Sequence, residues 1–229
     1  MSKFLLIHKS SGPTSHDIID ELRQITGIKK IGHAGTLDPF ASGLLIVAVG
    51  RESTRQISDF VKLDKEYEAT LKLGVVSDSY DRTGEIQLTT NNLQLAKEKI
   101  EKVLEKFIGS QEQIPPMFSA KKVQGKKLYE LARQGIEIER PPQQIEIHKI
   151  KLLRFENNLL KILVHCSSGT YIRSLAHDIG QALGCGAYLQ ELVRTQIGKY
   201  KLKDAIETKK LNKNNWENYT LQIDESNIR

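Results

Sequence analysis

Short apolar or alternating segments run through much of the chain and predict β-strands. The clearest is residues 67–73, where apolar and aromatic residues alternate with polar ones, as on a strand with one buried face. Asn157 and Asn158 separate two further segments of this kind and favour a hairpin turn between them. The strands predicted in this way are residues 4–7, 44–49, 67–73, 145–153 and 159–166.

Apolar residues at helical spacing predict helices between these strands. Isoleucine and leucine residues recur every three or four positions between residues 18 and 25, with Ser15 as the expected N-cap and Gly27 at the end. Residues 93–108 carry one apolar face, and residues 171–183 form a helix that ends before a glycine. Strands and helices mix without regular βα alternation, which predicts an α+β fold rather than a doubly wound sheet.

Two stretches differ from the rest in composition. Residues 113–144 contain four prolines and a run of lysines. The residues after Lys209 are polar and basic with few apolar side chains, so we expect them to be poorly anchored. We therefore expect a polar basic tail over residues 209–229, after the main body of the chain, residues 1–208.

Composition narrows the class of protein. A chain of 229 residues with 39% hydrophobic and 27% charged residues can bury a core without a disulfide or a metal. Its net charge of +6 permits a polyanionic partner. The longest apolar run, residues 44–49, is too short to span a membrane. Cys166 and Cys185 do not form a CxxC pair, so we expect a soluble, cytoplasmic protein with reduced thiols and no membrane partner.

The common cofactor motifs are missing from the sequence. It contains no GxxxxGK[ST] phosphate loop, no HExxH motif and no Cys/His cluster with the spacing of metal ligands. We therefore expect no cofactor and no metal.

Asp38 lies in a glycine-bearing loop, residues 32–43, and is followed by Pro39. Such a pair most often only opens a turn, because Asp accepts local backbone hydrogen bonds and proline presets φ. The alternative is a carboxylate held on a loop where the backbone can approach a ligand closely. A carboxylate in that position can attack an electrophilic carbon and form a covalent intermediate. The loop alone leaves both interpretations open.

Residues 33–45, with the sequence HAGTLDPFASGLL, resemble the active-site signature of the tRNA pseudouridine-55 synthases, the TruB-type family. Further segments resemble the N-terminal, tyrosine, insertion and arginine blocks of that family in the expected order; they are residues 9–15, 65–84, 113–129 and 166–175. Ser10 stands where the family usually has proline. The resemblance implies the pseudouridine synthase fold, with a mixed, largely antiparallel sheet, flanking helices and loops, and an RNA-gripping insertion. It implies one catalytic domain over residues 1–208, with the insertion at residues 113–144.

The resemblance implies catalytic roles for three residues. Asp38 would be the nucleophile, Tyr67 would stack on the target uracil and assist proton removal, and Arg173 would pair with the Asp38 carboxylate. Taken without the resemblance, Tyr67 and Arg173 fit equally well as a core tyrosine and a helix-surface arginine. The sequence leaves open whether Asp38 bonds to C1′ of the ribose or to C6 of the uracil.

Other residues are implied to bind the substrate. His33 would fill the space that a flipped uridine leaves in the RNA loop, Leu192 would contact the base, and Lys9 would line the cleft or contact phosphate. Basic residues of the insertion would bind phosphates. They are Lys121, Lys122, Lys126, Lys127 and Arg133.

The implied function is isomerisation of uridine 55 in the T-loop of tRNA to pseudouridine. The T-arm of tRNA is the expected partner, and no obligate protein partner is expected. Bacterial members of the family commonly add a C-terminal PUA RNA-binding domain, and residues 209–229 are too few to form one, so we expect none. Two alternatives stay open: a tRNA-folding role beside or instead of catalysis, and action on another RNA.

Overall fold

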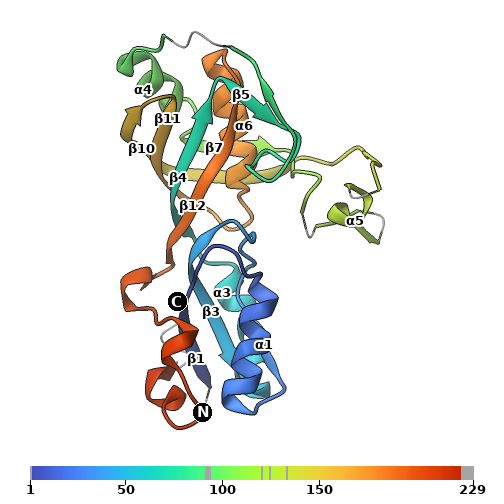
Figure 1. Ribbon diagram of the computed structural model, residues 1–229, viewed down its shortest axis with the longest axis vertical. Helices are drawn as coiled ribbons and strands as arrows, with labels where there is room; N and C mark the ends of the chain where they lie inside the picture. Colours follow the sequence, from blue (N-terminus) through green and yellow to red (C-terminus); the bar gives the residue numbers. More distant parts are fainter. Residues whose placement is uncertain (1, 91–93, 120, 124, 133, 223–229) are drawn as a thin grey trace. The chain divides into compact units, whose positions relative to one another are not determined.

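The computed structural model describes residues 2–90, 94–119, 121–123, 125–132 and 134–222, without the side chains of Lys122, Lys127 and Gln222. The chain divides into two compact units, which Figure 1 colours along the sequence. Unit 1 comprises Met1–Glu68 and Leu192–Arg229, and unit 2 comprises Ala69–Glu191. Strands β4 (Lys65–Leu73) and β12 (Ala187–Ile197) each contribute residues to both units.

The sheet of unit 1 is built on β1 (Lys3–Lys9) and β3 (Ser42–Val49), which pair antiparallel along their length. β2 (Ile31–His33) pairs antiparallel with β3, and β12 pairs parallel with it, Val193 facing Ser42 and Arg194 facing Gly43. β3 is buried almost throughout, as its unbroken apolar sequence predicts. Apolar side chains of β1 and β3 form two hydrophobic clusters.

Helix α1 (Ser15–Thr26) packs its apolar residues into one of these clusters. Thr14, rather than Ser15, is its N-cap: the Thr14 hydroxyl accepts from the amide of Asp17, and the Asp17 carboxylate accepts from the amide of Thr14. Gly27 ends the helix with a φ of 72°, as predicted. The short helices α2 (Arg51–Arg55) and α3 (Ile57–Val61) follow β3, and Phe60 enters the other cluster.

The C-terminal residues return to unit 1. β13 (Tyr200–Lys201) and the 3-10 helices η1 (Leu202–Asp204), η2 (Thr208–Lys210) and η3 (Trp216–Tyr219) lead to β14 (Thr220–Gln222), which pairs antiparallel with β1. Leu211 and Trp216 are buried in the cluster that α1 covers. The expectation of a poorly anchored tail is therefore wrong for residues 209–222, because a few large apolar side chains and one strand pairing are enough to hold it.

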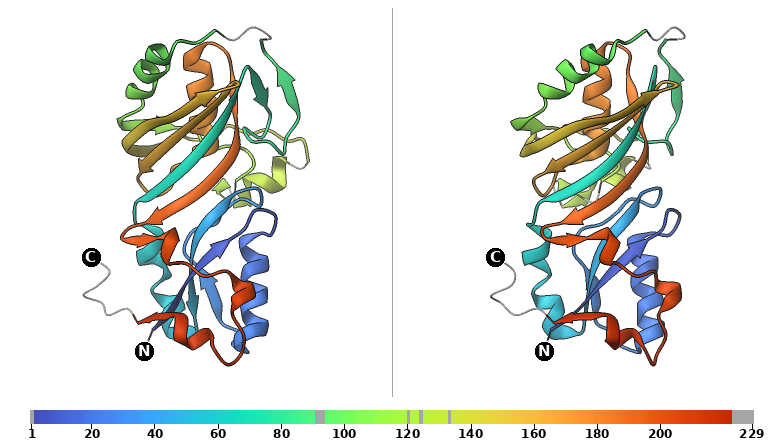
Figure 2. Two further views of the ribbon diagram at one scale, coloured as in Figure 1. Left: turned by 60° about the vertical axis from the view of Figure 1, so that its left-hand side comes forward. Right: turned by 90° about the vertical axis from the view of Figure 1, so that its left-hand side faces the viewer.

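Unit 2 contains a largely antiparallel sheet in the order β12-β4-β11-β10-β7. β10 (Gln143–Glu156) and β11 (Leu159–Cys166) form the predicted hairpin, and Asn157 and Asn158 take φ values of 51° and 61° at its turn. β7 (Gly109–Gln113) pairs with β10. Helices α4 (Lys97–Glu105) and α6 (Ile172–Leu183) lie on one face of this sheet (Figure 2).

Smaller elements complete unit 2. β5 (Val75–Ser77) and β6 (Ile86–Leu88) form a separate two-stranded sheet. The proline-rich insertion contains β8 (Lys122–Val123), β9 (Lys126–Lys127) and α5 (Leu128–Ala132), with its own small cluster around Met117, Leu128 and Leu131. The α+β class and the largely antiparallel sheet are confirmed. No helix among the described residues is long and apolar enough to cross a membrane.

Candidate active site

The loop between β2 and β3 carries Asp38, and polar groups of the N-terminal segment hold the residues around it. The Ser15 hydroxyl accepts from the amide of Leu37 at 2.9 Å and donates to its carbonyl at 3.1 Å. Ser11 donates to the carbonyl of Phe40 at 2.8 Å, and the amide of Gly12 donates to the carbonyl of Pro39 at 2.8 Å. Each bond fixes a neighbour of Asp38 to the N-terminal segment, so this loop has little freedom to move.

Lys9 lies beneath the same loop and is fully buried. Its Nζ donates to carbonyl oxygens on both segments: Ser10 at 2.9 Å, Pro13 at 2.8 Å, Pro39 at 3.3 Å and Ala41 at 2.7 Å. Burial lowers the pKa of Lys9 to about 8, and the Asp38 carboxylate partly opposes this shift. Lys9 therefore lies beside the Asp38 loop, where its ammonium contacts carbonyl groups of the chain. Its role in lining the cleft or contacting phosphate stays a prediction.

Arg194, on β12, is a second buried cation near Asp38 and is only 1% exposed. Its Nε donates to the carbonyl of Leu44 at 2.8 Å, and its terminal nitrogens donate to the carbonyls of Gly35 at 3.0 Å and Thr36 at 3.5 Å. Burial lowers the pKa of the guanidinium, whereas the charge and a side-chain hydrogen bond of Tyr67, and then the charge of Asp38, raise it. Asp38, Tyr67 and Arg194 thus interact within unit 1.

Tyr67 lies on β4 and is 7% exposed, so it is a core residue whose hydroxyl also joins a polar group. Leu192 is likewise 7% exposed. His33, at the end of β2, lies edge-to-face with His16, and its Nδ1 is buried without a hydrogen-bond partner among the described residues. Burial lowers the pKa of His33, and the positive charge of Arg194 lowers it further. Both effects favour the neutral form of the imidazole.

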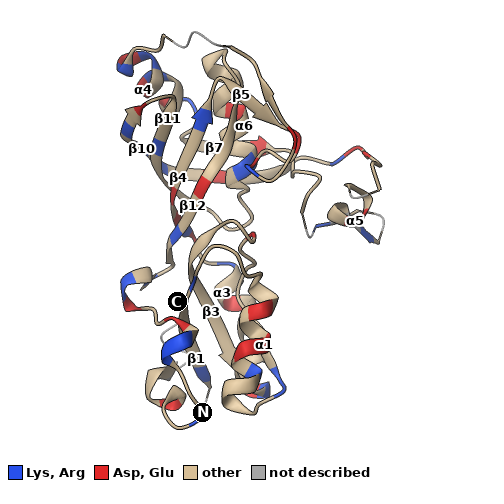
Figure 3. Ribbon diagram, viewed as in Figure 1, with Lys and Arg blue, Asp and Glu red and all other residues tan. Residues whose placement is uncertain are grey.

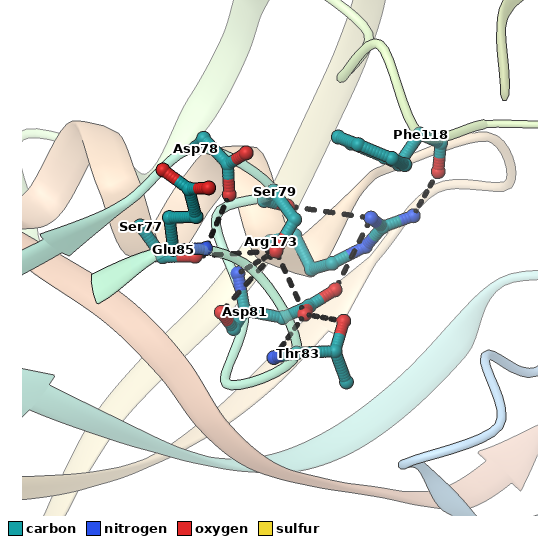
Figure 4. A network of polar contacts seen from close by, with 8 residues as sticks. All are labelled: Ser77, Asp78, Ser79, Asp81, Thr83, Glu85, Phe118 and Arg173. Atoms are coloured by element: carbon teal, nitrogen blue, oxygen red, sulfur yellow. Dashed lines mark hydrogen bonds and ion pairs between the residues drawn. The ribbon is translucent and has the colours of Figure 1, made fainter. Parts of the chain in front are cut away.

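Arg173 lies in unit 2, in the first turn of α6, and its guanidinium forms an ion pair with Asp81 at 3.3 Å (Figure 4). It also donates to the carbonyls of Ser79 at 3.4 Å and Phe118 at 2.6 Å. Both charged side chains are almost fully buried, so Arg173 is not the helix-surface arginine that its sequence position allowed. Its pairing with Asp38 would join the two units and stays a prediction.

The turn after β5 holds Asp81 in place (Figure 4). The Asp81 carboxylate accepts from the Ser79 hydroxyl at 2.9 Å and from the amide of Thr83 at 2.8 Å. A Cβ on Gly84 would lie 2.0 Å from Oδ1 of Asp78 and 2.5 Å from the Ser79 hydroxyl, so a larger residue there would displace these side chains. Asp81 lies within residues 65–84, the block that resembles the family's tyrosine block, and is not among the predicted site residues.

The insertion is tied to the first turn of α6. Gln113 donates to the carbonyl of Tyr171 at 3.0 Å and accepts from its amide at 2.8 Å. The Ser174 hydroxyl donates to the carbonyl of Ile114 at 3.0 Å, next to the bond between Arg173 and Phe118. The start of the insertion is therefore anchored on the helix turn that carries Arg173.

The insertion carries both basic and acidic residues (Figure 3). Lys121 donates to Gln143 at 3.0 Å, and Lys126 is exposed. Arg133 and the side chains of Lys122 and Lys127 lie outside the described residues. Among the described side chains, no group of three or more His, Cys, Asp and Glu residues is arranged to hold a metal ion.

Comparison with known proteins points to the same family as the sequence blocks described above. A family model described as TruB family pseudouridylate synthase (N terminal domain) matches residues 23–172, and one described as tRNA pseudouridylate synthase B C-terminal domain matches residues 173–229. The tRNA pseudouridine synthase B of Protochlamydia amoebophila is 52% identical over 202 residues, which cover 88% of this chain and 76% of the relative. The enzyme of the same name from Clostridium novyi is 45% identical over 226 residues, 99% of this chain and 78% of the relative.

Solved structures show the same fold. A chain from the crystal structure of a Cbf5-Nop10-Gar1 complex matches with a TM-score of 0.70 and 30% identity over 90% of this chain. One from an H/ACA RNP bound to a substrate RNA containing 2′-deoxyuridine matches with a TM-score of 0.66 and 29% identity, again over 90%. This chain spans about half the length of those two chains, 52% and 50%. By sequence and by fold, the chain belongs to the TruB family of pseudouridylate synthases.

Proposed function

We propose that this protein converts uridine 55 in the T-loop of tRNA to pseudouridine, with Asp38 as the nucleophile. The N1–C1′ bond breaks, the freed uracil turns, and C1′ bonds to C5; the C5 proton leaves and N1 gains a proton. The observation that carries the proposal is the Asp38 loop, which is held from several sides by buried polar groups and lies beside Tyr67 and two buried cations. The tRNA pseudouridine synthases B that this chain resembles support the choice of substrate.

Asp38 attacks either C1′ of the ribose or C6 of the uracil. A carboxylate beside the anomeric carbon can stabilise or trap an oxocarbenium-like state, as in retaining glycosidases. An acid is not needed for the leaving group, because uracil departs as a resonance-stabilised anion. The nearby cations Lys9 and Arg194 favour the ionised carboxylate that either route requires.

The remaining residues bind the RNA. A uridine inside a folded loop must leave the stack before it can react, and the neutral, partly buried ring of His33 is suited to fill the vacated space. Leu192 offers an apolar contact to the flipped base. The lysines of the insertion bind phosphates, and the insertion is anchored beside Arg173 through Gln113 and Phe118.

The test is tritium release from a T-arm RNA labelled at C5 of uridine 55. The wild type should release tritium, whereas Asp38→Asn, which keeps the size of the side chain but not its charge, should release none and still bind the RNA within about threefold. Asp20→Asn, an exposed carboxylate of α1 paired with Arg23, is the matched control and should behave as wild type. Release by Asp38→Asn at a comparable rate would exclude Asp38 as the nucleophile. Release only from RNA labelled at the neighbouring T-loop uridine would exclude position 55.

A further inference from the structure

We propose that Arg194 is a positioning residue for the reaction, which holds the Asp38 loop at both ends and orients the Tyr67 hydroxyl for proton transfer. The inference rests on the proposed function and adds a residue to it. Arg194 lies on β12, a strand that the sequence pattern did not predict.

The burial of Arg194 needs an explanation. Arg194 is among the largest fully buried side chains of the described residues. Removing a guanidinium from water is unfavourable unless all of its N–H groups donate hydrogen bonds. An apolar side chain of similar volume would fill the same space without that cost. The charge is therefore better explained by the groups to which it donates than by packing.

Those groups bracket Asp38. The guanidinium donates to Gly35 and Thr36 before Asp38 and to Leu44 after it. One rigid, planar fork thus joins the start of the loop to the strand in which the loop ends. The backbone between these points, with Asp38 at its centre, cannot shift as a whole while the fork is in place.

The backbone of Arg194 is itself held in place by Gly43. Arg194 and Gly43 face each other in the parallel pairing of β12 with β3. A Cβ on Gly43 would lie 2.4 Å from the carbonyl oxygen of Arg194 and 2.5 Å from its nitrogen, so the two backbones approach more closely than any other residue would allow. The start of the Arg194 side chain is therefore fixed relative to the strand that follows the Asp38 loop.

The bond to Tyr67 has a direction. Arginine can only donate hydrogen bonds, so the Tyr67 oxygen is the acceptor in its bond with Arg194. The hydroxyl proton of Tyr67 must then point away from Arg194. Arg194 therefore links the position of the nucleophile's loop to the orientation of the tyrosine hydroxyl.

A double-mutant cycle between Arg194 and Tyr67 tests this inference. Arg194→Lys keeps a positive charge but loses the fork, and we expect it to slow single-turnover tritium release by about 10- to 100-fold, with RNA affinity within about threefold of wild type. In the Tyr67→Phe background the same substitution should slow release by at least about threefold less than in the wild type, because the hydroxyl that Arg194 orients is already gone and only its bonds to the Asp38 loop are lost. Arg194→Gln, which removes the charge but keeps a donor, is the second variant if Arg194→Lys does not fold.

Thr195→Val is the matched control. Thr195 is the next residue of β12 and donates to Glu66, and this variant should release tritium at the wild-type rate. Equal losses from the Arg194 substitution in both backgrounds would show that Arg194 does not orient Tyr67 and would overturn the inference, as would an unchanged rate. Absence of release by the wild type would instead overturn the proposed function, and this inference with it.

Discussion

The Asp81 carboxylate accepts a hydrogen bond from the guanidinium of Arg173, with 3.3 Å between oxygen and nitrogen. The side chains of Asp81 and Arg173 are only 4% and 6% exposed. Removing one partner of a buried ion pair leaves an uncompensated charge. Asp81→Asn should therefore lower the free energy of unfolding by about 3 kcal/mol, measured by urea denaturation. Displacement of Arg173 should also slow tritium release by roughly 10- to 100-fold. Asp78→Asn in the same turn, which has no described bond to Arg173, should cost stability without a comparable loss of rate.

The ammonium of Lys9 makes stability depend on pH. Burial lowers the pKa of Lys9 from 10.5 to about 8, so between these values the unfolded chain binds more protons than the folded one. The free energy of unfolding should therefore rise with pH from about 8 to 10.5, by up to roughly 3 kcal/mol relative to Lys9→Met. Urea denaturation at several pH values measures this difference. Lys102→Met, an exposed lysine of α4, should follow the wild-type curve, and a flat difference for Lys9→Met would contradict the expectation.

Substitutions at two glycines distinguish the cost of backbone strain from the cost of a close contact between backbones. Gly12 and Gly43 have φ values of 116° and 117°, but only a Cβ on Gly43 would meet another atom within 4 Å. Gly12→Ala should lower the free energy of unfolding by about 1–3 kcal/mol through strain alone. Gly43→Ala should lower it further, because the backbones of β3 and β12 must separate. Equal losses in thermal or urea unfolding would show that the approach of Arg194 to Gly43 is not tight.

Lys126, an exposed lysine of the insertion, is predicted to contact phosphate. Lys126→Ala should weaken RNA binding and reduce the slope of log affinity against log salt by roughly 0.7–0.9, the value for one phosphate contact. The affinity is measured by filter binding or anisotropy between low and moderate salt. Lys102→Ala removes a lysine outside the insertion and should leave the slope unchanged. If both variants keep the wild-type slope, Lys126 is only a solvated residue.

Most of the secondary structure could be predicted because apolar residues recur with the period of the element they form. β1, β3, β4, β10, β11, α1 and α6 follow their patterns closely. β12 escaped prediction because Arg194 and its polar neighbours interrupt the alternation, and only the structure shows that the charge is buried. The C-terminal segment was misjudged for the opposite reason: Leu211 and Trp216 are too few to form a pattern, yet both reach the core.

In the candidate site, too, some residues could be predicted from the sequence and others could not. The resemblance identified Asp38, Tyr67 and Lys9, and the structure brings these residues close enough in unit 1 to influence one another or a shared neighbour. Arg194 and Asp81 were missed because each acts through a neighbour that is distant in sequence: Arg194 lies more than 150 residues from Gly35 and Thr36, and Asp81 lies 92 residues from Arg173. Burial of a charge depends on tertiary structure, and no local sequence pattern reports it.

The division of the chain into two units also sets the order in which they can fold during synthesis on the ribosome. Unit 2 is one continuous stretch, Ala69–Glu191, whereas unit 1 joins the first residues of the chain to the last, with β1 placed between β3 and β14. The cluster around Trp216 cannot close until the C-terminal residues have left the exit tunnel. We expect unit 2 to fold in the nascent protein while β1 still lacks its pairing with β14. Hydrogen exchange of ribosome-bound nascent chains should then protect amides of β10 and β11 before those of β1 that bond to β14.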